Sequence, residues 1–194
     1  HVAVEATDHG LASTIVNNDL LEHYGVSEKQ LFEDAMITAP EVMPVKIDTM
    51  LNVISGMMPE AVSDDMMMDD SFPGASMMIV SNTTMVNGAS ALFYPGVMDE
   101  IADKIGGDYV VLPSSTNELI VVPDQGDYKT LECMVKDINA TTVDPKEQLS
   151  DHVYHYDSKE KLFERTDKFE ARKAEKEKAP EKKSILSDLK AKKA

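Results

Sequence analysis

The chain has 194 residues, of which 42% are hydrophobic, and its formal net charge at pH 7 is −16. This length suits one domain, or one domain with a small appendage, and the composition can supply a real core. No stretch approaches 18 consecutive apolar residues, so the sequence predicts no membrane-spanning helix and no membrane partner.

Cysteine and methionine usage indicates the compartment. The single cysteine, Cys133, excludes a disulfide within the chain, and a cysteine-based zinc site is not expected. Thirteen methionines, which oxidise easily, favour a reducing compartment, so we expect a cytoplasmic protein. We expect no metal and no cofactor. The chain starts at His1 without a secretory signal, and the missing Met predicts further residues upstream.

Charge is divided unevenly along the chain. Residues 1–157 carry 6 Lys/Arg and 27 Asp/Glu, a net charge of −21, whereas residues 158–194 carry 13 and 8, a net charge of +5. An acidic body repels phosphates, so we expect no direct nucleic-acid binding by it. The acidic charge has three alternative explanations: it keeps the protein soluble, it forms a surface that binds a protein partner, or it imitates nucleic acid.

Residues 1–57 are expected to form an N-terminal hairpin followed by helices. Small and β-branched residues on both sides of Asp8-His9-Gly10 predict the hairpin. Asn17 and Gly25 have the residue types of a helix N-cap and C-cap. Ser27-Glu28-Lys29-Gln30 has the capping-box pattern and predicts a helix ending near Pro40. A further helix is predicted over Lys46–Met57 from its apolar spacing.

The next segment, residues 58–75, is predicted to be an acidic, methionine-rich loop. Four aspartates flank three methionines in the run from Ser63 to Asp70. Loops of this length are functional or disordered, and this composition favours disorder. The adjacent Asp pairs lack the alternating ligands and central Gly of an EF-hand, so no calcium site is expected.

Residues 76–157 are predicted to form an α+β core with an antiparallel sheet. The expected order is β-β-α-β-β-α, with strands Met77–Val80 and Ala89–Tyr94, helix Val97–Ile105, strands Tyr109–Leu112 and Leu119–Val122, and a helix from Asp127 to Ile138. Strands joined by short turns pair antiparallel, and the two amphipathic helices are expected mainly on one face. The second helix is expected to face inward with Leu131, Met134, Val135 and Ile138.

Residues 158–194 are predicted to form a basic helix and tail. A strand over 151–157 is followed by a helix cap at Asp157 or Ser158, and the expected anchors are Leu162, Phe163 and Phe169. Few hydrophobic residues follow, except in Ser184–Leu189, which is more typical of a short docking segment than of a core. The edge strands of the predicted sheet could also pair between chains, which allows a homo-oligomer.

The loop Pro113–Glu118 is the strongest candidate for a functional site. Ser114, Ser115, Asn117 and Glu118 offer two hydroxyls, an amide and a carboxylate for a polar ligand. A nucleophilic serine there would make the protein a hydrolase or transferase, but it needs a base within hydrogen-bonding reach. Only the fold could bring His152 or His155 near it. The competing interpretation is that Pro, Ser and Asn are ordinary turn residues.

The two histidines are not expected to share a metal. His152 and His155 are three residues apart on a predicted strand, so their side chains point to opposite faces. No glycine-rich phosphate loop and no Gly-x-Ser-x-Gly motif is present. The sequence therefore favours an interaction protein over an enzyme.

Several motifs together resemble an uncharacterised bacterial family, a domain of unknown function in gut-associated Gram-positive bacteria. They are Asn87-Gly88-Ala89 with Phe93-Tyr94-Pro95-Gly96, Gly107-Asp108-Tyr109 with Leu112-Pro113-Ser114-Ser115, and Leu149-Ser150-Asp151 with Tyr154-His155-Tyr156-Asp157. The resemblance covers roughly residues 10–170 and implies a longer N-terminus but no activity. Tyr94, Asp151 and Tyr154 are further candidate ligand or interaction residues.

Two details of the resemblance bear on function. In the family a histidine often follows the Pro-Ser-Ser-x stretch, but this chain has Asn117 there. If that histidine were a base in relatives, this chain would lack it. The basic ending, Lys-Ser-Ile-Leu-Ser-Asp-Leu-Lys, is similar to endings of proteins carried on mobile genetic elements.

Overall fold

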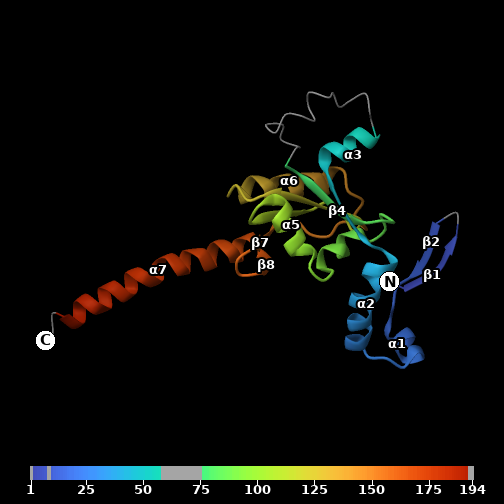
Figure 1. Cartoon of the computed structure of the whole chain (residues 1–194), viewed down its shortest axis with the longest axis horizontal. Helices are drawn as coiled ribbons and strands as arrows, with labels where there is room; N and C mark the ends of the chain where they lie inside the picture. The colour runs from blue at the N-terminus through green and yellow to red at the C-terminus, as the bar shows by residue number, and fades with distance from the viewer. Residues whose placement is uncertain (1, 8–9, 58–75, 192–194) are drawn as a thin grey trace. The chain divides into compact units, whose positions relative to one another are not determined.

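The structure is a computed structural model that describes residues 2–7, 10–57 and 76–191, with side-chain surroundings given for 14–57 and 76–178. The chain divides into two compact units, His1–Val42 and Met43–Ala194. Their elements can be followed in Figure 1. The predicted acidic loop at 58–75 lies outside the described residues. Within them, no helix is long and apolar enough to cross a membrane.

The first unit contains one hairpin and two helices. Strands β1 (Val2–Thr7) and β2 (Gly10–Thr14) pair antiparallel, as predicted. Helix α1 (Asn18–Tyr24) begins after Asn17, whose side chain accepts a hydrogen bond from the Leu20 N–H, and it ends at Gly25 with φ of 68°. Both predicted caps are therefore confirmed.

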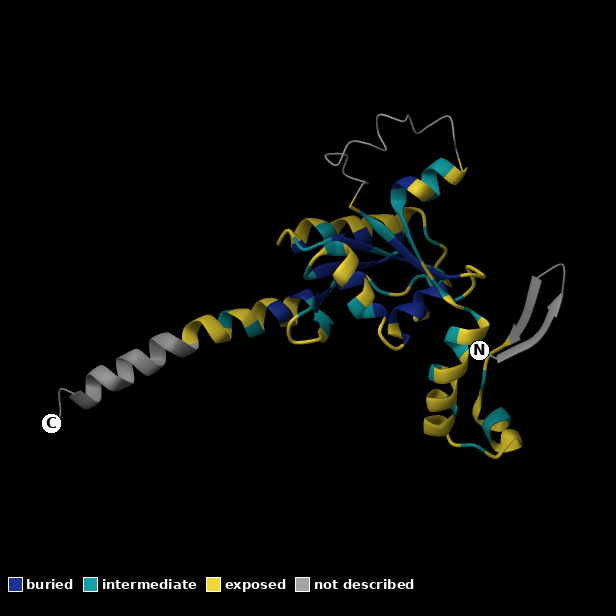
Figure 2. Ribbon diagram, viewed as in Figure 1, coloured by how far each residue is buried: buried dark blue, intermediate teal, exposed yellow. Residues whose placement is uncertain are grey.

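Helix α2 (Glu28–Val42) departs from its prediction in two details. The Ser27 hydroxyl caps the Gln30 N–H, but the Gln30 amide turns forward to Asp34 and leaves the capping box half formed. The helix also continues past Pro40. Neither α1 nor α2 has a buried residue, and Figure 2 shows both helices in the colours of exposed and intermediate residues.

The second unit is built on a six-stranded, fully antiparallel sheet in the order β3-β4-β6-β5-β7-β8. The predicted α+β class is therefore confirmed, whereas the predicted order of elements is not. The strands are β3 (Val45–Thr49), β4 (Met78–Asn82), β5 (Tyr109–Pro113), β6 (Leu119–Pro123), β7 (Tyr154–Asp157) and β8 (Leu162–Arg165).

The helix predicted over Lys46–Met57 is wrong in its first part. Residues 45–49 form β3, which pairs with β4, and α3 (Met50–Met57) follows directly. The alternation of Val45, Ile47 and Thr49 with polar residues suits a strand, and the Thr49 hydroxyl caps α3 by accepting from the Asn52 N–H. Because β3 pairs with β4, it belongs to the second compact unit. The boundary between the two units therefore falls after residue 42 and not after residue 57, where the N-terminal segment was predicted to end.

The strand predicted over Ala89–Tyr94 is also wrong. Residues Gly88–Phe93 form a 3-10 helix, η2. Asn87 precedes it in the left-handed region, with φ of 50°, and directs the chain into a helical turn. A short apolar run does not distinguish strand from helix by its periodicity, and here the local backbone decides.

The helices cover both faces of the sheet and not mainly one. Helix α5 (Val97–Ile105) lies over the face of Tyr109, whose hydroxyl donates to the Met98 carbonyl at 3.2 Å. Helix α6 (Tyr128–Thr141) packs with Val110, Leu112 and Val122, which alternate to the other face. Buried residues accordingly concentrate in the sheet and against it (Figure 2).

The strand order explains this two-sided arrangement. Strand β4 reaches β5 across β6 through α5, and β6 reaches β7 across β5 through α6. The two crossovers shift in the same direction along the sheet but start from strands that run in opposite directions. Crossovers of one hand therefore place their helices on opposite faces. Helix α6 buries a narrower face than predicted, since Met134 and Ile138 are 47% and 46% exposed.

The last helix begins later than predicted. The Asp157 carboxylate accepts from the Lys159 and Glu160 N–H groups and forms a turn, and Leu162 and Phe163 then form β8. Helix α7 (Thr166–Ala191) follows without a break. Phe169 alone of the three expected anchors lies on this helix, where it stacks on His155 with ring centroids 3.6 Å apart.

Arg172 ties α7 to the β7–β8 hairpin. Its guanidinium donates to Asp157 at 3.2 Å, to Glu164 at 2.6 Å and to Glu160. Burial raises the pKa of Asp157, but the Glu160 N–H and Arg172 lower it more, so the pKa lies below its ordinary value. This carboxylate therefore stabilises the fold above its unfolded pKa, and the contribution is lost as pH falls through the folded pKa.

We expect Arg172→Gln to lower the free energy of unfolding by about 2 kcal/mol at pH 7, between the values for exposed and buried ion pairs. The loss should shrink below about pH 4, where the carboxylates become protonated in both proteins. Urea denaturation at both pH values measures it. Arg165→Gln is the control, because Arg165 pairs only with exposed Asp167 in the described structure. An equal loss at both pH values would contradict this account.

Candidate functional site

An apolar pocket of about 450 Å³ opens on the face of the sheet that α5 also covers. Its floor is formed by Val111 of β5, Leu119 of β6 and Tyr154 of β7. Val111 is paired with Val121 on one side and with Tyr154 on the other, so these side chains share one face. The rims are formed by η2 and by the 149–150 segment.

Aromatic rings form one wall of the apolar pocket. The ring of Tyr154 stacks on Phe163 of β8, with centroids 5.3 Å apart and planes 10° apart. Phe93 of η2 meets the same Phe163 edge to face at 5.6 Å. The Tyr154 hydroxyl donates to Ser150 at 3.2 Å and thereby fixes the ring. Phe93 and Leu149 remain 50% and 45% exposed at the mouth.

The other wall is held by a close backbone contact at Gly88. A Cβ placed on Gly88 would lie 2.1 Å from the Ser81 hydroxyl, 2.5 Å from the Asn117 carbonyl and 2.8 Å from the Asn82 nitrogen. Only glycine permits η2 to approach the ends of β4 and the 113–118 loop this closely. Gly88 therefore sets the position of the η2 side chains that line the apolar pocket.

The predicted 113–118 loop borders the apolar pocket, and its Ser115 and Asn117 side chains bond to the backbone. Pro113 and Thr116 line the pocket. The Ser115 hydroxyl accepts from the Asn117 N–H at 3.1 Å, and the Ser115 N–H donates to the Glu118 carbonyl. These are the bonds of a turn, in agreement with the structural interpretation. No hydrogen bond of the Ser114 side chain is found among the described residues, and Glu118 is half-buried without an ion pair there.

Asn117 joins three segments of the fold. Its side-chain oxygen accepts from the Asn87 N–H at 3.1 Å, and its carbonyl accepts from the Ser81 hydroxyl at 2.7 Å. Its amide nitrogen approaches Glu147 at 3.4 Å. Asn117 therefore has a structural role, because its side chain holds the backbone at the start of η2.

The remaining candidates are divided among separate places. Tyr154 lines the apolar pocket, as described above. Tyr94 is buried at the end of η2, and this burial raises the pKa of its phenol above the ordinary value. Asp151 accepts from the Asn139 amide at 2.8 Å and fastens the chain to the end of α6. The structure thus brings Tyr154 and the loop together but leaves Tyr94 and Asp151 outside the pocket.

Neither histidine is bonded to Ser114 or Ser115 in the described structure. His152 contacts the Glu132 carboxylate at 3.0 Å, and His155 contacts Asp124 at 3.2 Å. The predicted strand over 151–157 begins only at Tyr154, so His152 lies before β7 and the two histidines make different contacts. The described residues hold no group of three or more potential metal ligands. The serine-nucleophile hypothesis receives no support from this geometry.

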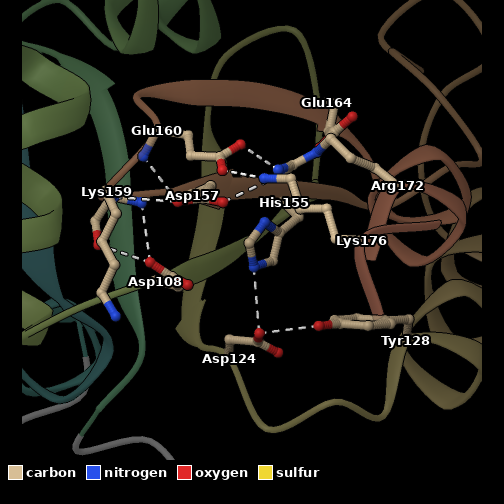
Figure 3. A network of polar contacts seen from close by, with 11 residues as sticks. Asp108, Asp124, Tyr128, His155, Asp157, Lys159, Glu160, Glu164, Arg172 and Lys176 are labelled. Atoms are coloured by element: carbon tan, nitrogen blue, oxygen red, sulfur yellow. Dashed lines mark hydrogen bonds and ion pairs between the residues drawn. The ribbon is translucent and has the colours of Figure 1, made fainter. Parts of the chain in front are cut away.

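The Asp124 contact belongs to a polar network in the core (Figure 3). One carboxylate oxygen of Asp124 receives both the Tyr128 hydroxyl at 2.9 Å and the His155 Nε2 at 3.2 Å. Burial raises the pKa of Tyr128 well above its ordinary value, with the Asp124 contact adding to the effect. His155 is fully buried under Phe169, and its Nδ1 has no partner among the described residues. Phe169 of α7 covers the imidazole and keeps solvent from it. The network therefore stabilises the packing of α7 against the sheet.

A comparison with known protein families finds one match, which covers most of the chain. A family of unknown function, DUF5688, matches residues 1–158. The chain belongs to DUF5688. No curated protein and no solved structure is similar enough to count as a match.

The DUF5688 match ends between β7 and β8. It includes most of the apolar pocket, but Phe163 of β8 lies beyond it, as does Phe169 of α7. In this DUF5688 chain the following segment therefore completes both the aromatic wall and the core. Sequence analysis missed Leu92, Phe93, Leu149 and Phe163 as pocket residues. The available signal was that Phe93 and Leu149 stand within the resemblance motifs.

Proposed function

We propose that this DUF5688 chain is an interaction protein that binds a hydrophobic segment of a protein partner in the apolar pocket. The observation that carries the proposal is the pocket itself, where Phe93 and Leu149 remain about half exposed beside a buried apolar floor. Exposed large apolar side chains around a concavity are typical of a binding site. In the adjoining loop the Ser115 hydroxyl and the Asn117 amide are hydrogen-bonded within the chain, so apolar contact is the main source of affinity.

Charge supports a partner segment with basic residues beside its apolar anchors. Glu118, Glu147 and Asp151 lie on the segments that border the apolar pocket, and none of them takes part in an ion pair among the described residues. Residues 1–157 as a whole carry a net charge of −21. Charges around an interface favour a complementary partner and speed its association. We expect this interaction to take place in the cytoplasm, because the single cysteine and thirteen methionines favour a reducing compartment.

The test is selection of binding peptides from a random library displayed against the full chain. We expect the enriched peptides to carry apolar anchors flanked by Lys or Arg and to lose at least about tenfold in affinity for Leu149→Lys. Leu149 is half exposed, so this change should alter stability by only about 0.5 kcal/mol.

Ile138→Lys is the matched control, because Ile138 is 46% exposed on α6, across the sheet from the apolar pocket. Peptides that bind wild type and Ile138→Lys equally, and Leu149→Lys poorly, support the proposal. Peptides that bind all three proteins equally, or no enrichment at all, would refute it.

A further inference from the structure

The chain itself contains a segment with the chemistry that the apolar pocket requires. From Glu170 to the C-terminus the only large hydrophobic residues are Ile185, Leu186 and Leu189. They lie within α7, which extends from Thr166 to Ala191. Residues separated by three and four positions share one face of a helix, so these three can form a single apolar stripe. We call residues 182–193 the tail segment.

Charge makes the tail segment complementary to the body. It contains Lys182, Lys183, Lys190, Lys192 and Lys193 against one acidic residue, Asp188. Residues 76–157, which contain most of the apolar pocket, carry 4 Lys and 13 Asp/Glu, a net charge of −9. An apolar helix stripe in an apolar groove, with charges matched around it, is an established mode of peptide recognition.

Helix geometry prevents the tail segment from reaching the pocket of its own chain. Phe163, which lines the apolar pocket, is three residues before α7 begins. With a rise of 1.5 Å per residue, Ile185 lies about 28 Å along the helix from Thr166. A continuous helix cannot return over this distance, so the pocket is left for a tail segment from elsewhere.

We propose that the apolar pocket of one copy binds the tail segment of a second copy, so that the protein self-associates through this contact. The inference rests on the proposed function, because it uses the same pocket, and it names a second copy of this chain as the partner. The tail segment supplies Ile185, Leu186 and Leu189 to the pocket. Its lysines face the acidic residues on the bordering segments, Glu118, Glu147 and Asp151.

The experiment is a complementation test by sedimentation velocity on full-length chains. Wild type should self-associate with rising concentration, and association should weaken at high salt because the charged contacts are screened. Leu149→Lys damages the pocket and Leu186→Lys damages the tail segment, so each variant alone should associate at least about tenfold more weakly. Mixing the two should restore association, since one intact pocket then meets one intact tail segment. Ile138→Lys should associate as wild type does.

Three outcomes would overturn the inference: a wild-type chain that stays monomeric at every concentration, association that Leu149→Lys and Leu186→Lys leave unchanged, or a mixture that fails to restore it. If wild type is monomeric while library peptides still bind in the pocket, the proposed function stands and only the tail partner is wrong. If library peptides also fail to distinguish Leu149→Lys from wild type, the proposed function fails as well.

Discussion

Gly88→Ala is expected to lower the free energy of unfolding by about 3 kcal/mol, at the upper end for an overpacked site. The added methyl group would overlap the Asn117 carbonyl and the Asn82 nitrogen, at 2.5 and 2.8 Å. Both are backbone atoms held in the sheet and its loops, so they cannot rotate away as a side chain would. Denaturant unfolding monitored by circular dichroism measures the loss.

Two further variants separate this clash from the general effect of losing a glycine. Gly107→Ala is the control, because nothing lies within 4 Å of its added Cβ and its backbone is not in the left-handed region. It should change stability by less than about 0.5 kcal/mol. Removing the Ser81 hydroxyl together with Gly88→Ala should recover only part of the loss. Full recovery would show that the backbone approach is not the constraint.

Phe169→Ala is expected to cost about 3–4 kcal/mol, the range for deleting a buried aromatic ring. The ring is 8% exposed, stacks on His155 and meets Tyr128 edge to face at 6.1 Å. Its loss would open a cavity beside the fully buried imidazole. Leu162→Ala, at a 37% exposed position of the same C-terminal region, should cost much less.

Truncation extends this prediction to the whole C-terminal segment. A chain that ends at Ser158, where the family match ends, should fail to unfold cooperatively, because Tyr128 and His155 lose the ring of Phe169 that covers them. A chain that ends at Lys178 keeps Phe169 and Arg172 and should remain folded. Cooperative unfolding of both chains with equal stability would show that α7 is not part of the core.

Helices whose ends depend on neighbouring residues were predicted correctly from the sequence. Helix α5 begins at Val97 and ends at Ile105, as predicted, because its apolar residues recur at helical spacing and Gly106 ends it with φ of 89°. The caps of α1 at Asn17 and Gly25 are correct for the same reason. These features depend only on residues within one or two turns of each other.

Long-range pairing decided the elements that were predicted wrongly. Residues 45–49 become a strand because β4, some 30 positions later, supplies a partner for each residue. Gly88 lies in a turn of η2 because Asn117 accepts from the Asn87 N–H. The loop at 113–118, predicted to be the candidate site, borders the apolar pocket. The Ser115 hydroxyl was not distinguishable from a ligand group until its bond to the Asn117 N–H was known.

The central claim, that the apolar pocket binds a hydrophobic partner segment, is tested most directly by amide chemical-shift mapping with a library-selected peptide on the ¹⁵N-labelled chain. The claim predicts the largest shifts at Ala89, Leu92, Val111 and Tyr154 and small shifts on the opposite face of the sheet. Shifts centred instead on α6, around Leu131 and Val135, or spread evenly over the acidic surface, would contradict it.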